Sequence, residues 1–222
     1  MTNNLHSDPS VIINPYRFAA AASAFAYVDG VGVNFSGTLQ SDHAFTLEAG
    51  EDYAGIAICR AVTVTSLATD QGDTVTERGE MTGGGDLSAA KGFEFTASDT
   101  STTIELTANA TGGARVIFLW KVTGAVFQAS AGDTSASGAS SLIEADINTV
   151  SGDVAMAAAF WSSGTGNITA SNGLDTVDDT IVETRKFAAG SKSIVTGGTP
   201  ETFTIATDAG FKQGGGYFLI YR

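Results

Sequence analysis

Val116-Ile117-Phe118-Leu119-Trp120 is an unbroken apolar run, and it follows the alternating stretch Thr103-Ile104-Glu105-Leu106-Thr107. Alternation of apolar and polar residues predicts a strand with one face in a core. A continuous apolar run of this length is typical of a strand that is covered on both faces. The two stretches together predict an all-β fold in which residues 116–120 form a central strand.

The same two patterns return at the end of the chain. An alternating stretch, Thr202-Phe203-Thr204-Ile205-Ala206, precedes the apolar run Tyr217-Phe218-Leu219-Ile220-Tyr221. Between them lies Gly214-Gly215-Gly216, which we interpret as a turn because glycine adopts positive φ at no steric cost. The spacing of roughly one hundred residues is far longer than the period of about 20–50 residues of a solenoid. We therefore predict an internal duplication.

The composition agrees with a sandwich of antiparallel sheets. Charged residues make up 16% of the 222 residues and hydrophobic residues 43%. Long helices depend on Glu, Lys, Arg, Leu and Gln, whereas this chain is dominated by Thr, Val, Ile, Phe and Gly, which favour strands and turns. We expect an antiparallel β-sandwich built from two similar halves. The halves could form one shared sandwich or two, and we favour one compact sandwich.

The sequence also suggests where the halves begin and end. The one low-complexity stretch, residues 129–141, is rich in Ser, Ala and Gly and lies between the two repeats, as a linker or a long crossing loop would. The expected organisation is an N-terminal arm with the first strands (1–44), a first β half (45–128), the linker or crossing loop (129–141) and a second β half (142–222).

The charge balance argues against several kinds of partner. Lys and Arg number 11 against 24 Asp and Glu, which gives a net charge of -13. Such a chain is repelled by phosphate backbones and by anionic membrane surfaces, so we expect no nucleic-acid partner. The first residues lack the basic and apolar pattern of a signal peptide, and the Ala-rich stretch 18–28 is too short to span a bilayer. We expect synthesis in a cytoplasm without cleavage, and no membrane insertion.

The residue inventory offers little for catalysis. The chain has two histidines and one cysteine, and it carries none of the short motifs for zinc, nucleotide or nucleophile sites. Cys59 lies in an apolar run and is interpreted as a small buried hydrophobe. Asp42 and His43 are adjacent, and neighbours in a strand point to opposite faces, so they do not suggest a triad. We expect no catalytic, metal-binding or cofactor-binding residues and no cofactor.

Four residues are candidate ligand contacts. Trp161 precedes a Ser- and Gly-rich stretch, so it could lie at a strand end beside an exposed loop, although packing in the core is the more usual role of a tryptophan. Asp175, Asp178 and Asp179 are clustered. Aspartates in turns commonly bind local backbone, and loop carboxylates can also bind Ca²⁺, but the spacing matches no twelve-residue calcium loop.

Short motifs in both halves resemble a known group of proteins. In the first half, Gly50-Glu51-Asp52 precedes the apolar stretch Tyr53–Cys59, and Val62–Leu67 runs into Asp70-Gln71-Gly72-Asp73-Thr74. In the second half, Ala129–Ser141 leads to Gly152-Asp153 and the apolar stretch Val154–Phe160. From Phe45 to Arg222 the chain resembles the duplicated β-sandwich, jelly-roll-like structural proteins of tailed phages and gene transfer agents.

The resemblance implies a non-enzymatic virion protein, either a capsid decoration protein, a head fibre or a spike. It implies a place on the virion surface, other virion proteins of the capsid or tail as partners, assembly into a homo-oligomer, and no cofactor. An alternative is a tail-fibre or spike receptor-binding module that recognises host surface glycans through loops around Trp161 and Asp175–Asp179. A glycan hydrolase is the third alternative, for which no pair of acids stands out.

Overall fold

The computed structural model describes residues 25–35, 39–60, 63–82, 89–110, 113–135, 142–161, 168–171, 175–182, 185–207 and 214–222. Within these ranges, side chains are described except at 34, 35, 135, 142–145, 161, 168–171, 175–182, 185 and 205–207. The described residues form strands, turns and bends, and they contain no helix. The all-β prediction is therefore confirmed.

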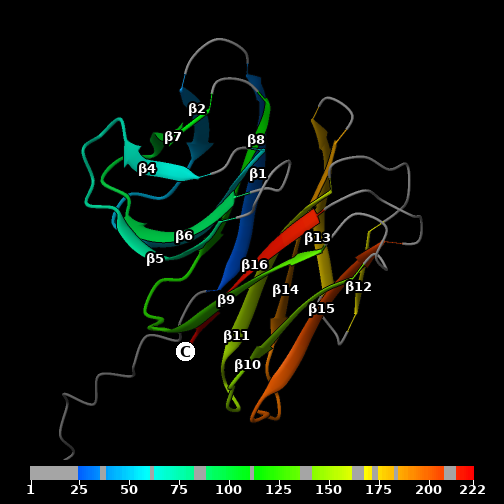
Figure 1. Cartoon of the computed structure of the whole chain (residues 1–222). Coiled ribbons are helices and arrows are strands. Elements are labelled where there is room, and N and C mark those ends of the chain that lie inside the picture. The colour runs from blue at the N-terminus through cyan, green and yellow to red at the C-terminus, as the bar shows by residue number, and fades with distance from the viewer. Residues whose placement is uncertain are drawn as a thin grey trace, which may run out of the picture.

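Sixteen strands occur in the described part of the chain (Figure 1). The first eight are β1 (Ala26–Phe35), β2 (Gln40–Thr46), β3 (Asp52–Cys59), β4 (Val64–Thr69), β5 (Thr76–Met81), β6 (Ala89–Thr96), β7 (Ser101–Ala108) and β8 (Gly113–Lys121). The second eight are β9 (Phe127–Ser135), β10 (Leu142–Ile147), β11 (Val154–Trp161), β12 (Ile168–Ser171), β13 (Asp175–Val182), β14 (Arg185–Ser193), β15 (Glu201–Thr207) and β16 (Gly214–Tyr221).

The strands form four antiparallel sheets, two in each half. In the first half, inner sheet 1 has the order β1-β8-β3-β6-β5 and outer sheet 1 has the order β2-β7-β4. In the second half, inner sheet 2 has the order β9-β16-β11-β14-β13 and outer sheet 2 has the order β10-β15-β12. Adding eight to each strand number of the first half gives the order of the second half, so the two halves have the same topology.

Each half is a jelly-roll-like sandwich. A jelly roll places strands 1, 8, 3 and 6 side by side in one sheet and strands 2, 7 and 4 in the facing sheet. Both halves follow this order, with the fifth strand of each half joined to the edge of the inner sheet. The expected antiparallel, jelly-roll-like β-sandwich is therefore present. Each half forms a sandwich of its own, so the expectation of one sandwich shared by both halves is wrong.

The turns that lead into β3 and β11 show how closely the halves correspond. Gly50 and Gly152 both have positive φ, 85° and 95°. The amide of Gly50 donates to the carbonyl of Ala97, and the amide of Gly152 donates to the carbonyl of Ile194. The equivalent glycines are 102 residues apart (152 minus 50), close to the spacing of roughly one hundred residues between the repeated sequence patterns.

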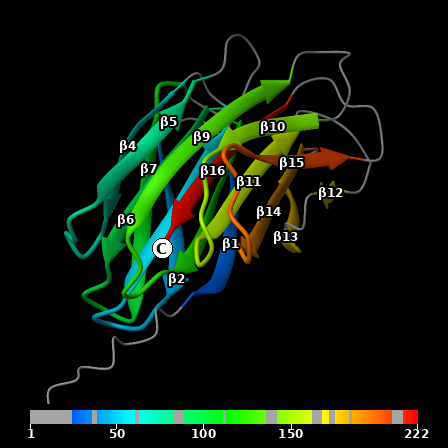
Figure 2. The ribbon, with the colours of Figure 1, turned by 90° about the horizontal axis from the view of Figure 1, so that it is seen from below.

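The sheets stack as four layers, with the two inner sheets in the middle (Figures 1 and 2). One core fills the space between the sheets of the first half and another fills the space between those of the second half. A third core lies between the two inner sheets and joins the halves. Each inner sheet is therefore covered on both faces, which explains why its central strands are apolar throughout.

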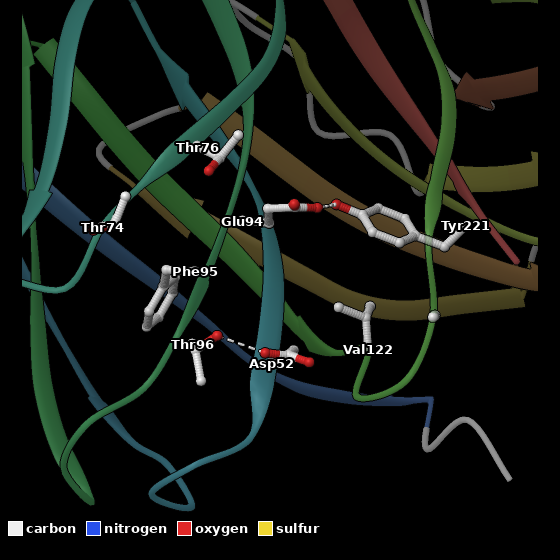
Figure 3. A pocket seen from close by; sticks show the side chains of 9 residues that line it. Asp52, Thr74, Thr76, Glu94, Phe95, Thr96, Val122 and Tyr221 are labelled. Carbon is white, nitrogen blue, oxygen red and sulfur yellow. Dashed lines mark hydrogen bonds between the residues drawn. The ribbon is translucent and has the colours of Figure 1, made fainter. Parts of the chain in front are cut away.

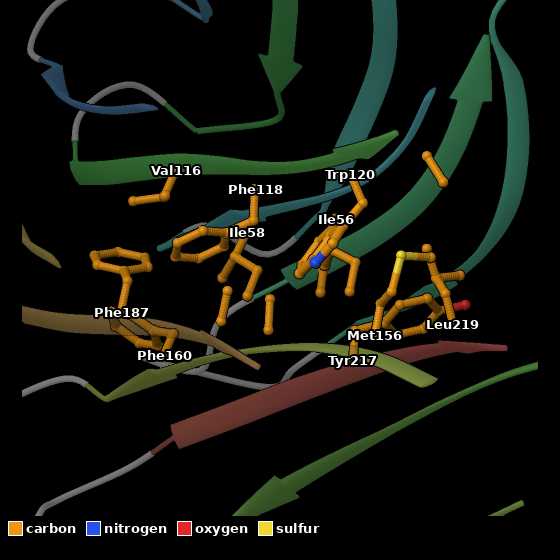
Figure 4. Packing of buried hydrophobic residues seen from close by; sticks show 14 of the residues in the cluster. Ile56, Ile58, Val116, Phe118, Trp120, Met156, Phe160, Phe187, Tyr217 and Leu219 are labelled. Atoms are coloured by element: carbon orange, nitrogen blue, oxygen red, sulfur yellow. The ribbon is translucent and has the colours of Figure 1, made fainter. Parts of the chain in front are cut away.

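The middle core shows how one strand serves two layers. In β8, Val116, Phe118 and Trp120 face the middle core, whereas Ile117 and Leu119 face outer sheet 1. The middle core is completed from the second half by Met156, Phe160, Phe187, Tyr217 and Leu219, among others (Figure 4). The prediction that residues 116–120 and 217–221 are central strands covered on both sides is confirmed.

The linker expected at 129–141 differs from the structure. Residues 127–135 form β9, an edge strand that pairs with β16, while 136–141 lie outside the described residues. Ala129 and Ala131 pack against the core of the second half, and Gly132 lies where a Cβ would come within 2.8 Å of Met81 and Tyr217. The small residues that suggest a linker are required here by close packing.

β1 and β2, expected with an N-terminal arm, belong to the first sandwich.

The turn expected at Gly214-Gly215-Gly216 is also wrong. These glycines form the first part of β16, where Gly214, Gly215 and Gly216 pair with β9 on one side and with β11 on the other. Gly215 pairs with Phe160, whose ring lies 5.0 Å from that of Phe187 in the middle core. A residue without a side chain leaves room for these large rings on the neighbouring strands.

Candidate functional site

The four residues that the sequence singles out as ligand contacts all lie on inner sheet 2. Trp161 is the last residue of β11, so the expected strand-end position is confirmed for its backbone. Asp175, Asp178 and Asp179 belong to β13, so the expectation that they lie in a loop is wrong. Strand β13 is an edge strand, and charged residues on an edge discourage pairing with a foreign strand.

The register of β14 shows how far apart these residues are. Lys186 of β14 pairs with Trp161 of β11, and Ser191 of β14 pairs with Asp175 of β13. Five residues along a strand span about 17 Å, so Trp161 and Asp175 lie at different ends of the sheet. The side chains of Trp161, Asp175, Asp178 and Asp179 lie outside those that the structure describes, and their role as ligand contacts stays a prediction.

A cavity of about 310 Å³ lies where the two halves meet (Figure 3). Tyr221 of β16 is the lining residue that the second half contributes. The remaining wall comes from β3, β5, β6, the residues just before β5 and the segment that follows β8. The full lining is Asp52, Thr74, Thr76, Glu94, Phe95, Thr96, Val122, Ala125 and Tyr221.

Glu94 is the charged group at the centre of this junction. It belongs to β6, and its carboxylate accepts a hydrogen bond of 2.6 Å from the hydroxyl of Tyr221. Its other oxygen forms an ion pair with Arg78 of β5. The glutamate side chain is 26% exposed, so the charge is partly withdrawn from water and compensated by donors on two sides.

These contacts determine the ionisation of the pair. Burial alone would raise the pKa of the Glu94 carboxyl, but the hydrogen bonds from Arg78 and Tyr221 outweigh burial and hold the pKa below its usual value. Burial and the neighbouring carboxylate raise the pKa of the Tyr221 hydroxyl. At neutral pH the glutamate is therefore ionised and the tyrosine is protonated, which is the state that the hydrogen bond needs.

Other contacts at the junction also cross from one half to the other. The guanidinium of Arg78 lies over the ring of Phe127 in β9, 4.9 Å from the ring centroid. The hydroxyl of Tyr217 donates to the carbonyl oxygen of Arg78 over 3.0 Å. The junction is thus fixed by polar contacts as well as by the middle core.

Asp52 is the second carboxylate of the cavity, and it is also held in place. Thr96 Oγ1 donates to Asp52 Oδ1 over 2.6 Å. The backbone amide of Asp52 donates to Thr123 Oγ1, and its carbonyl accepts from the amide of Val122. Asp52 therefore presents a carboxylate of fixed orientation at the wall of the cavity (Figure 3).

A separate polar cluster is buried in the first half. Ser41 and His43 of β2 are 1% and 0% exposed, and Arg115 of β8 is 1% exposed. His43 Nδ1 lies 2.8 Å from the carbonyl oxygen of Val31, which requires a proton on Nδ1, so Nε2 accepts from the Ser41 hydroxyl at 3.1 Å. Arg115 donates to Ser41 and to several backbone carbonyls.

This cluster contains nucleophile and base types but is closed to a substrate. Burial is the main cause that lowers the pKa of His43 to about 4. Burial also raises the pKa of the Cys59 thiol to about 12, so the thiol is protonated at neutral pH. Asp42 points to the exposed face of β2, away from His43, as the alternation predicts. The arrangement connects β1, β2 and β8 rather than presenting a reactive group.

The cavity residues were not singled out by the sequence, although one signal was available. Glu94 lies between the buried residues Phe93 and Phe95, in a strand whose other residues are buried except Thr96. A charge in such a strand needs a partner, and the partner marks a place where another element approaches. Asp52 and Tyr221 carry no comparable signal because their proximity to the cavity depends on the packing of the two halves.

Metal clusters and membrane-spanning helices are both absent from the described residues. No cluster of three or more His, Cys, Asp or Glu side chains there is arranged to hold a metal ion. The same part of the chain contains no helix that could cross a membrane. No protein family, curated protein or solved structure matches the chain.

Proposed function

We propose that this chain is a non-enzymatic structural protein on the surface of a phage-like particle, as a capsid decoration protein, head fibre or spike. Its partners are capsid or tail proteins of the particle and further copies of the chain. It is synthesised in the cytoplasm of the host and incorporated into the particle without crossing a membrane.

The observation that carries this proposal is the face-to-face packing of two jelly-roll-like sandwiches. Jelly rolls are common in viral capsid proteins, and they provide large flat sheets on a rigid framework. Here the inner sheets share one buried apolar core, so the two sandwiches form one thick body. A body of this kind suits a protein that must keep its shape on a particle surface.

The edges of the inner sheets support the same role. Register shifts occur where β1, β5, β9 and β13 pair with their neighbours, and these four strands are the edges of the two inner sheets. Bulges of this kind prevent an edge from pairing with a foreign strand. A surface protein crowded among many copies of itself needs such protection, and its net charge of -13 adds to it.

Electron microscopy of particles that carry a labelled copy of the protein tests the proposal. The expected result is label on the particle surface at regular positions, with the protein sedimenting together with the particles. A variant without residues 1–14 tests whether the N-terminal arm is the anchor, and we expect it to fold and to stay in the supernatant. Label found only in the soluble fraction for the full chain would contradict the structural role.

A further inference from the structure

We propose that the cavity between β3, β6 and β16 binds one neutral sugar unit, with Asp52 and the threonines around it as the polar contacts. This site differs from the predicted contacts Trp161 and Asp175–Asp179, and it goes beyond the structural role without depending on it. The chemistry of the wall, its rigidity and its size favour such a ligand.

The wall is made of hydroxyl and carboxylate groups. Three threonines, Thr74, Thr76 and Thr96, line the cavity together with the carboxylates of Asp52 and Glu94. None of the lining residues is cationic or carries an amide side chain. Such a wall repels anions and offers acceptors to a ligand that is rich in hydroxyl donors, as a sugar is.

Apolar groups in the same wall suit the other face of a sugar ring. Of the apolar lining residues, Phe95 stacks on Tyr53 and Phe93 in the core of the first half, so the apolar part of the wall comes from Val122, Ala125 and Tyr221. A pyranose has a face of C–H groups that packs on apolar and aromatic side chains, while its hydroxyls point to polar partners. A wall with both kinds of group favours a ring of mixed polarity over a purely apolar ligand.

The carboxylates of the cavity are held in place before any ligand arrives. Asp52 is oriented by Thr96, and Glu94 is oriented by Tyr221 and Arg78. Fixed acceptors lose little conformational entropy on binding, which favours recognition of weak ligands such as single sugars. The cavity volume of about 310 Å³ lies at the lower end of the range for small-molecule sites, which suits one sugar unit rather than an extended chain.

The charge of the wall favours a neutral ligand over an ammonium ion. The ion pair with Arg78 compensates the charge of Glu94. Asp52 remains as one carboxylate, and Thr96 already donates to one of its oxygens. A single, partly buried carboxylate that water still reaches attracts an ammonium ion only weakly, whereas it is a good acceptor for a pair of sugar hydroxyls.

Titration by NMR with methyl glycosides of glucose, galactose, mannose and N-acetylglucosamine tests the proposal on the full chain. The expected result is saturable, millimolar binding of at least one glycoside that shifts the amides of Thr74, Thr76 and Thr96. Asp52→Asn and Thr76→Val should each weaken this binding about tenfold or more. Asp42→Asn, which changes an exposed carboxylate on outer sheet 1, should leave it unchanged.

Three outcomes would overturn the inference. One is that none of the four glycosides shifts these amides in a chain whose spectrum shows that it is folded. Another is that methylammonium shifts them and the glycosides do not. The third is that binding occurs but survives both cavity substitutions. If a glycoside binds, an array of immobilised oligosaccharides shows whether the natural ligand is a free monosaccharide or the terminal sugar of a glycan. Binding to the array identifies the terminal sugar of a glycan.

Discussion

The hydroxyl of Tyr221 in the second half donates a hydrogen bond of 2.6 Å to the carboxylate of Glu94 in the first half, 127 residues earlier in the chain. Arg78 binds the other oxygen of the same carboxylate and packs against Phe127 of the second half. This chain of contacts crosses the boundary between the sandwiches at the cavity. It predicts that the last strand contributes to the stability of the first half.

Removal of the Tyr221 hydroxyl tests this contact directly. Tyr221→Phe keeps the ring in the middle core but leaves one carboxylate oxygen of Glu94 without its donor, so we expect a loss of about 1–2 kcal/mol of unfolding free energy. The pKa of Glu94 should rise in the variant, because one of the hydrogen bonds that lower it is gone. Guanidinium denaturation and NMR titration measure the two effects, and an unchanged Glu94 pKa would contradict the assigned contact.

The shared core predicts that the two halves unfold together. Leu219 is 0% exposed in the middle core, so Leu219→Ala should cost about 2–5 kcal/mol. Far-UV circular dichroism, which reports both halves, and tryptophan fluorescence should show one coincident transition in the wild type and in the variant. Val195→Ala is the matched control, because that side chain is 82% exposed and the change should cost less than about 0.5 kcal/mol.

Two separate transitions, one for each half, would contradict this prediction. They would mean that the buried layer between the inner sheets contributes little, and that each sandwich is stable by its own core. The same measurement therefore also tests whether the two sandwiches act as the single rigid body on which the proposed surface role depends.

Residues whose environment is determined by nearby sequence could be predicted, and residues whose environment is determined by packing between halves could not. The runs at Val116–Trp120 and Tyr217–Tyr221 predict central strands because a strand covered on both faces must be apolar throughout. The repeated patterns predict two similar halves. The internal duplication itself stays a prediction, which the shared strand order supports.

Small residues were the main source of error. Gly214-Gly215-Gly216 and Ala129–Ser135 have compositions typical of turns and linkers, but both stretches are strands. Gly215 pairs with Phe160, and a Cβ on Gly132 would lie 2.8 Å from the ring of Tyr217. The sequence does not show which distant ring a glycine accommodates. For the same reason, Tyr221 and Glu94 could not be paired from sequence, since only the packing of the inner sheets brings them together.

Acid should destabilise the protein through His43. Its pKa is lowered from 6.5 to about 4 in the folded state, so between these values the unfolded chain binds a proton that the folded chain does not. The contribution of His43 is fully present above pH 6.5 and is lost as the pH falls toward 4, by about 3 kcal/mol in total. Arg115 and Asp42 are the charged groups that act on the imidazole, with opposite effects on its pKa.

Denaturation at several pH values between 7 and 4 measures this loss. His43→Gln removes the titrating group. The unfolding free energy of this variant should therefore fall less steeply between pH 7 and 4 than that of the wild type, even if the variant is less stable at every pH. Glu94 and Glu201 also have a lowered pKa in the folded protein, so their protonation destabilises the fold on acidification as well. Their effect is common to both proteins and cancels in the difference. Equal slopes for the wild type and the variant would show that His43 is not the cause.

Gly79 provides a last test of the junction, because the β5 backbone lies close to Tyr217 and Ser130 of the second half there. It has φ of +88°, and a Cβ at this position would lie 2.4 Å from the Tyr217 hydroxyl and 2.9 Å from Ser130 Oγ. Gly79→Ala should therefore strain the backbone and also displace Tyr217 from the carbonyl of Arg78. Gly72 has φ of +74° with no atom within 4 Å of the added Cβ, so Gly72→Ala carries only the backbone cost. We expect Gly79→Ala to be less stable than Gly72→Ala by about 1 kcal/mol or more in guanidinium denaturation. Equal losses of unfolding free energy in the two variants would show that the approach of Tyr217 to β5 contributes nothing to the junction.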